Sequence, residues 1–149
     1  MRHGHSPNAA DAGVLSDAER PLSKRGEAQT RAQAAKLAAA GGKPRLILHS
    51  PLRRAVETAR SAADILNVPM ESFAPLSNSM GPEDLAKTLA GPLAQSMELL
   101  IIGHQPQVGE LSAWLSGQLV EFSPAAIVAL EIPQAPGAKT ARLLWAENP

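Results

Sequence analysis

Cysteine and tyrosine are absent from the 149-residue sequence, and aromatic side chains are limited to two tryptophans and two phenylalanines. Without cysteine the chain forms no disulfide bonds and has no thiolate nucleophile or thiolate metal ligand. The shortage of aromatic residues argues against binding of single-stranded nucleic acid, because such surfaces stack bases on several exposed rings. We therefore expect no nucleic-acid partner and a core of Leu, Ile, Val and Ala.

Long apolar runs are also lacking. No uninterrupted apolar segment approaches the ~18 residues that a membrane-spanning helix requires, and no secretory signal pattern precedes the domain. We therefore expect a cytoplasmic protein without a membrane partner. The formal net charge is zero, yet residues 1–60 contain 11 of the 14 basic residues and only 5 of the 14 acidic ones. This uneven distribution indicates a local anion-binding site.

The hydrophobic pattern alternates between helices and short buried strands, which is typical of an α/β fold. The chain shows no repeat or linker that would divide it, so we expect a single domain covering residues 1–149. Helices are predicted at residues 24–40, 51–66, 83–89 and 106–115, the second with Ser50 as its N-cap and Pro51 at its first position. Strands are predicted at residues 45–49, 70–74, 98–102, 125–132 and 141–145, with the last two antiparallel.

Arginine and histidine residues gather at three places where a strand ends or the chain turns. Arg2 and His3 precede a turn, Arg54 follows the strand at 45–49, and His104 follows the strand at 98–102. In an open parallel sheet the carboxyl ends of the strands share one edge, where helix N-termini favour anions. We therefore expect a site for a phosphate-like dianion with a nucleophile beside it.

A metal-dependent hydrolase is an alternative, because the sequence has four histidines and His3-x-His5 is a real ligand spacing. However, no set of Asp and Glu ligands accompanies them, and Arg2 and Arg54 would repel a cation. We therefore expect neither a metal nor another cofactor.

Four segments resemble motifs of the histidine phosphatase superfamily, which includes phosphoglycerate mutases and acid phosphatases. Residues 2–4 resemble its Arg-His-Gly signature, residues 50–59 its second motif, and residues 103–104 its late histidine motif. Residues 20–26 resemble the Arg-Pro-Leu-Ser/Thr-x-x-Gly segment of the small phosphohistidine phosphatase branch called SixA. The resemblance implies a three-layer α/β/α sandwich with a mostly parallel central sheet, as in phosphoglycerate mutase.

The resemblance also implies the roles of individual residues. His3 would attack phosphorus and form a covalent phosphohistidine, while Arg2, Arg54 and His104 would hold the phosphoryl oxygens. In the register of the second motif the phosphate contact falls on Arg54. Two further substrate contacts are expected from Arg20 and Gly4. The implied enzyme is a metal-independent histidine phosphatase that hydrolyses phosphoric monoesters or phosphoramidates.

The identity of the leaving group is indicated by a missing carboxylate. Many relatives carry an acid after the second helix, but residues 73–80 contain none. General acid assistance is worth ~10²–10⁴-fold, so an alkoxide would leave poorly, whereas a protonated P–N bond is already labile. We therefore expect phosphohistidine on a protein, such as a histidine-containing phosphotransfer domain, and a monomeric enzyme. The alternatives are a phosphatase of small phosphorylated metabolites and a non-catalytic phosphoprotein-binding module.

The resemblance further predicts an apolar strand of about five residues before the Arg-His-Gly signature, a usual strand length. Only Met1 precedes Arg2 in this sequence, so the first strand is truncated. Loss of a central strand would leave backbone groups and a core face unpaired. This expectation leads to the hypothesis that translation begins a few codons upstream of Met1.

Overall fold

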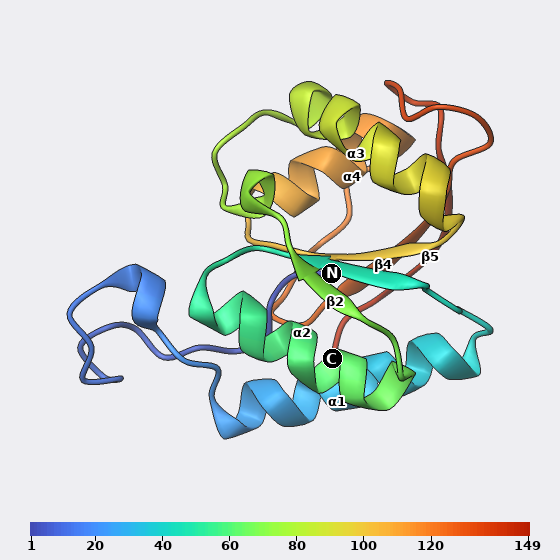
Figure 1. Cartoon of the computed structure of the whole chain (residues 1–149). Coiled ribbons are helices and arrows are strands. Elements are labelled where there is room, and N and C mark those ends of the chain that lie inside the picture. Colours follow the sequence, from blue (N-terminus) through green and yellow to red (C-terminus); the bar gives the residue numbers. More distant parts are fainter.

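The computed structural model describes residues 1–149 and has three layers, with a central sheet between two pairs of helices (Figure 1). Helices α1 (Lys24–Ala39) and α2 (Arg53–Leu66) cover one face, and α3 (Pro82–Ser96) and α4 (Gln107–Ser116) cover the other. Two short 3₁₀ helices, η1 (Asp17–Glu19) and η2 (Ala74–Leu76), lie in connecting segments. The predicted α/β/α sandwich is confirmed.

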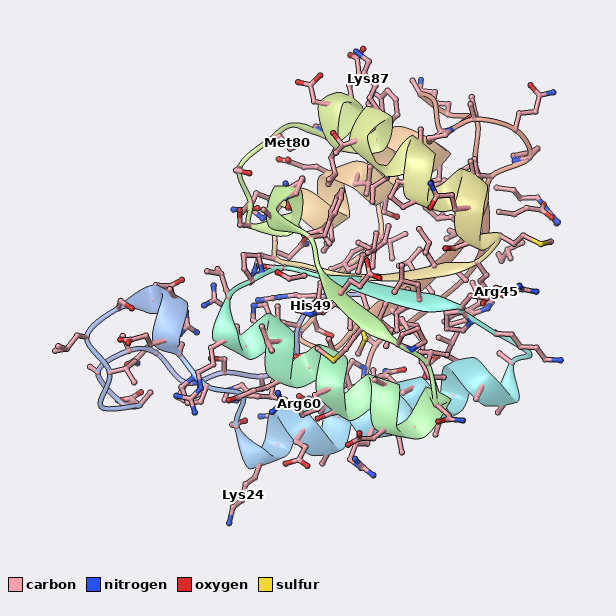
Figure 2. The ribbon with its side chains drawn as sticks, viewed as in Figure 1. Lys24, Arg45, His49, Arg60, Met80 and Lys87 are labelled. Carbon is pink, nitrogen blue, oxygen red and sulfur yellow. The ribbon has the colours of Figure 1, made fainter.

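The sheet combines a parallel part with an antiparallel hairpin. Strands β1 (Leu46–His49), β2 (Met70–Ser72) and β3 (Leu99–Ile102) are parallel in the order β2-β1-β3. Strands β4 (Ile127–Glu131) and β5 (Arg142–Glu147) pair antiparallel, as predicted. Figure 2 shows Arg45 and His49 near the two ends of β1, with the loop of residues 6–20 beyond the His49 end. The carboxyl ends of the parallel strands therefore face this loop.

Residues 1–3 connect the two parts of the sheet. Arg2 forms a parallel bridge with Gly103, and the His3 amide donates to the Gly103 carbonyl at 3.0 Å. On the other side the Arg2 amide donates to the Ala126 carbonyl and the Ala125 amide donates to the His3 carbonyl, both at 3.0 Å. The segment that carries His3 is thus held between β3 and the residues that lead into β4.

The sheet is hollow between β3 and β4 next to Met1. Two cavities of about 140 and 410 Å³ open there, and they share the apolar residues Leu99, Leu100, Val128, Leu130 and Ile132. The buried Met1 amino group donates to the Ile101 carbonyl at 2.7 Å, and burial lowers its pKa to about 5. The space between these strands is therefore unfilled and lined mainly by apolar side chains.

Two helix boundaries differ from the sequence prediction. Helix α2 begins at Arg53 with Leu52 as its N-cap, so the predicted start at Ser50 and Pro51 is wrong. The reason is that the fully buried Ser50 hydroxyl is used by a distant histidine, as described below. The predicted helix at 83–89 is too short, because α3 continues through Pro92 to Ser96. Leu93, in this extra turn, packs against the core beneath α3 and α4.

Candidate active site

The three Arg/His-bearing segments meet at the carboxyl edge of the parallel strands, as the sequence predicted. The Arg54 Nε lies 3.3 Å from His3 Nε2, although 51 residues separate them in the chain. The rings of His3 and His104 have centroids 5.0 Å apart and are tilted by 56°. All three side chains are buried. The fold therefore places a nucleophile candidate, a guanidinium and a second imidazole in one cluster.

The environment of His3 favours a neutral ring whose unprotonated Nε2 accepts a long hydrogen bond from Arg54 Nε. Its Nδ1 lies 2.7 Å from the Gly4 carbonyl oxygen, which can only accept, so Nδ1 carries the proton. The pKa of His3 is lowered to about 3, mainly by burial and also by electrostatic repulsion from His104, Arg54 and Arg2, while the Gly4 hydrogen bond opposes this shift. At neutral pH the Nε2 atom is therefore an unprotonated nitrogen, as nucleophilic attack requires.

The tautomer of His104 follows from its hydrogen bond to Ser50. The Ser50 hydroxyl lies 2.7 Å from His104 Nε2 and also accepts the Leu52 amide at 3.3 Å. His104 Nε2 is the only acceptor within reach of the Ser50 hydroxyl, so we assign the hydroxyl proton to this hydrogen bond, which leaves the His104 proton on Nδ1. Burial lowers the pKa of His104 to about 4, with Arg54 as the next cause. His104 Nδ1 is buried without a partner, so a donor is available to an anion.

Arg2 and Arg54 differ in how completely their nitrogens are bonded. The Arg2 Nη1 donates to the Phe122 carbonyl at 2.8 Å, while its Nε is buried without a partner. Burial lowers the pKa of Arg2. The Arg54 side chain is bonded on all three nitrogens, to His3 and to both the carbonyl and the carboxylate of Asp17. Arg54 therefore contacts His3 directly and is held more rigidly than Arg2, whose charge reaches His3 only through electrostatic repulsion.

Arg20 and Gly4 take up structural contacts in this structure. Arg20 donates through Nε to the Pro7 carbonyl at 2.7 Å and through Nη2 to the Ser6 carbonyl at 3.2 Å. The Gly4 amide donates to the Thr58 hydroxyl at 3.1 Å. Arg20 thus fixes the loop of residues 6–20. The substrate contacts expected of Arg20 and Gly4 remain predictions.

Asp17 is a site residue that the sequence did not reveal. It lies in η1 and accepts from Arg54 Nη2 at 2.9 Å and from Arg20 Nη1 at 2.8 Å. These hydrogen bonds, that of Arg20 first, lower the pKa of Asp17 and keep it ionised. The only sequence signal was its position three residues before Arg20, a spacing too common to be informative.

Two further observations concern metal binding and membrane-spanning helices. No group of three or more His, Cys, Asp or Glu side chains is placed to hold a metal ion. None of the helices combines the length and apolar character needed to cross a bilayer.

The arrangement around His3 consists of an unprotonated imidazole nitrogen surrounded by cationic and neutral donors. Such a cluster suits in-line attack on a phosphoryl group whose equatorial oxygens need positive partners.

Comparisons with known proteins agree with this geometry. Residues 1–82 match the family model of the histidine phosphatase superfamily (branch 1). An uncharacterized protein of Picosynechococcus sp. (strain ATCC 27264 / PCC 7002 / PR-6) is 36% identical over 114 residues, which cover 74% of this chain and 67% of the relative.

Solved structures share the whole fold. The tungstate complex of the protein histidine phosphatase SixA aligns with a TM-score of 0.84 and 26% identity, covering 98% of this chain and 92% of the other. A putative alpha-ribazole-5'-P phosphatase from Escherichia coli str. K-12 substr. MG1655 aligns with a TM-score of 0.69 and 20% identity, covering 96% and 91%. The chain belongs to the histidine phosphatase superfamily, and within it to the SixA-like branch.

Proposed function

We propose that this phosphatase removes phosphate from phosphohistidine on a protein through a covalent intermediate at His3. The observation that carries the proposal is the state of His3, whose Nε2 is unprotonated, buried and 3.3 Å from the Arg54 Nε. An oxygen nucleophile would need a base, whereas this nitrogen is ready to attack.

The proposed reaction has two steps. In the first, the His3 Nε2 lone pair forms a bond to phosphorus while the bond from phosphorus to the substrate nitrogen breaks. That nitrogen keeps the electron pair of the broken bond, and because the other ring nitrogen of the substrate imidazole already carries a proton, the leaving group is neutral imidazole. In the second, water attacks the phosphorus of phospho-His3 and releases inorganic phosphate, with the His3 lone pair restored. Arg2 Nε, Arg54 and His104 Nδ1 supply donors for the equatorial oxygens in both steps. No step requires a metal or another cofactor.

The choice of leaving group rests on the charge of Asp17. Asp17 is the carboxylate bonded to the site arginines, and these bonds lower its pKa, so it is ionised at neutral pH. An ionised carboxylate cannot protonate an alkoxide leaving group. The imidazole of a phosphohistidine needs less assistance, which favours a phosphoramidate over a sugar phosphate.

The surface beside the site favours a protein substrate. An open hollow of about 480 Å³ lies between the loop that contains η1 and the start of α2. Its lining includes Val14, Ala18 and the fully exposed Leu15, together with Arg53 of α2. Apolar side chains that rim an accessible hollow suit contact with a folded partner. A histidine-containing phosphotransfer domain fits this description, and the phosphatase is expected to act as a cytoplasmic monomer.

The test compares turnover of a phosphohistidine-bearing protein with turnover of a panel of phosphate monoesters. Wild type is expected to prefer the phosphoprotein, to form an acid-labile phosphoenzyme and to retain its activity in chelator. His3→Asn should abolish both turnover and the phosphoenzyme. His5→Asn is the matched control, because the His5 side chain is hydrogen-bonded to Ser23, which lies outside the site.

Each alternative function gives a distinct result in this experiment. Preferred turnover of a small phosphomonoester would assign a metabolite phosphatase, and phosphoprotein binding without turnover would assign a binding module. Equal turnover by wild type and His3→Asn would contradict the covalent mechanism. Loss of activity in chelator would point to the metal-dependent alternative.

A further inference from the structure

One edge of the Arg54 guanidinium is occupied by the protein itself. Nη1 donates to the Asp17 carbonyl at 2.7 Å, and Nη2 donates to the Asp17 carboxylate at 2.9 Å. The remaining nitrogen, Nε, points to His3 Nε2. Because a guanidinium is planar and its donors have a fixed fork geometry, a contact that fixes one edge also fixes the direction of the other.

Asp17 also connects Arg54 to the loop of residues 6–20. Its second carboxylate oxygen accepts from Arg20 Nη1 at 2.8 Å, and Arg20 is bonded to the carbonyls of Ser6 and Pro7. No residue of η1 is buried, so apolar packing does not hold this helix in place. The position of η1 over the site therefore depends on its polar contacts, of which Asp17 makes three with arginine side chains.

We propose that Asp17 is a positioning residue for phosphoryl transfer, an inference that rests on the proposed function. It holds the Nη1–Nη2 edge of Arg54 so that Nε and the free Nη2 hydrogen face the phosphoryl group attached to, or attacked by, His3. It also reduces the repulsion between Arg54 and Arg20 without occupying the edge that faces His3. The competing interpretation is that Asp17 is an intramolecular anion that phosphate must displace.

These two roles predict opposite effects of removing the carboxylate. If Asp17 positions Arg54, its loss releases the guanidinium and lowers turnover, since misplacement of a catalytic group by about 1 Å costs up to roughly 10²-fold in rate. If Asp17 competes with phosphate, its loss frees a cationic site and raises the affinity for phosphoryl groups.

The experiment measures kcat and KM for p-nitrophenyl phosphate and for phosphohistidine protein in Asp17→Ala and Asp17→Asn. We expect Asp17→Ala to lower kcat roughly tenfold or more with a smaller change in KM. Asp17→Asn should recover most of the rate, because its amide oxygen still accepts from Nη2. Asp11→Asn is the control, since it removes one negative charge from the same loop at an exposed carboxylate bonded to Asn8 and not to Arg54.

Binding of inorganic phosphate and vanadate, measured by calorimetry, separates the outcomes further. Weaker binding by Asp17→Ala supports positioning, whereas tighter binding or a raised kcat/KM would overturn it, as would kinetics equal to those of wild type. If wild type turns over neither substrate, the proposed phosphatase function fails by itself. The direction of the binding change then still decides the role of Asp17. A melting temperature measured for each variant separates loss of fold from loss of positioning.

Discussion

Acid should destabilise this protein in proportion to the number of buried neutral histidines. The pKa of His3 is about 3 in the folded chain, against ~6.5 for an unfolded histidine. The folded ring thus stays neutral at pH 5 while the unfolded ring binds a proton. Because the unfolded state binds more protons, stability falls as the pH falls from about 6.5 towards the folded pKa.

The magnitude follows from the unfolded pKa alone, provided that the folded pKa lies well below 5. Between pH 7.5 and pH 5, an unfolded histidine gains ~2 kcal/mol of protonation free energy that the folded His3 does not receive. His104, with a folded pKa of about 4, adds a similar amount. A combined loss of ~4 kcal/mol is a large part of the ~5–15 kcal/mol that holds a typical domain folded.

The variant His3→Asn isolates one of these contributions. At each pH we subtract the free energy of unfolding of wild type from that of the variant. This difference should be ~2 kcal/mol more positive at pH 5 than at pH 7.5, because the variant lacks the acid-sensitive His3. Urea unfolding followed by the fluorescence of Trp114 and Trp145 measures both proteins at both pH values. The difference between them cancels the contribution of the buried Met1 amine, whose pKa is also lowered.

Ser112→Ala serves as the control, because it alters a buried side chain without removing a titratable group. Its effect on the free energy of unfolding should be the same at pH 7.5 and pH 5. The reasoning is refuted if His3→Asn also has equal effects at the two pH values. A histidine ring signal of His3 in NMR spectra that titrates above about pH 5.5, near the ordinary value, would refute it as well.

Three other changes give measurable results. Gly4→Ala should lower stability by ~1–3 kcal/mol in chemical denaturation, because the added Cβ would come within 2.6 Å of the Gly26 carbonyl oxygen. Ser50→Ala should leave the buried His104 without its donor at Nε2, and we expect a lower kcat together with a loss of ~1–3 kcal/mol in the free energy of unfolding. An apolar extension of about five residues, a usual strand length, joined to Met1 should raise the melting temperature by filling the hollow between β3 and β4.

Each of these has a matched control. Gly91→Ala adds the same methyl group where nothing lies within 4 Å, so it should not destabilise the protein. Ser77→Ala removes a hydroxyl bonded only within its own turn, and its kcat should equal that of wild type. An extension of the same length built from glycine and serine should not raise the melting temperature. An equal gain from both extensions would contradict the interpretation of the cavities.

The sequence by itself determined the order and type of the main elements. Helical spacing of alanines and short apolar runs act over a few residues, so they can be recognised without knowledge of the fold. The choice of Arg54 over Arg53 came from the resemblance of residues 50–59 to the second motif of the family. The structure agrees with this choice, because Arg53 pairs with Glu57 at 2.8 Å, one helical turn away, while Arg54 is only 7% exposed and reaches His3. The shared carboxyl edge of parallel strands then predicted that the Arg/His-bearing segments would meet.

The tertiary structure alone decided the finer chemistry of the site. Asp17 contacts Arg54 across 37 residues, and Ser50 contacts His104 across 54, so no local pattern indicates either pair. The protonated nitrogen of His104 depends on its distant partner Ser50, and the depressed pKa values of both imidazoles depend on burial that only the packed chain produces. Local propensity therefore specified which residues could react, and long-range packing specified their charge, tautomer and orientation.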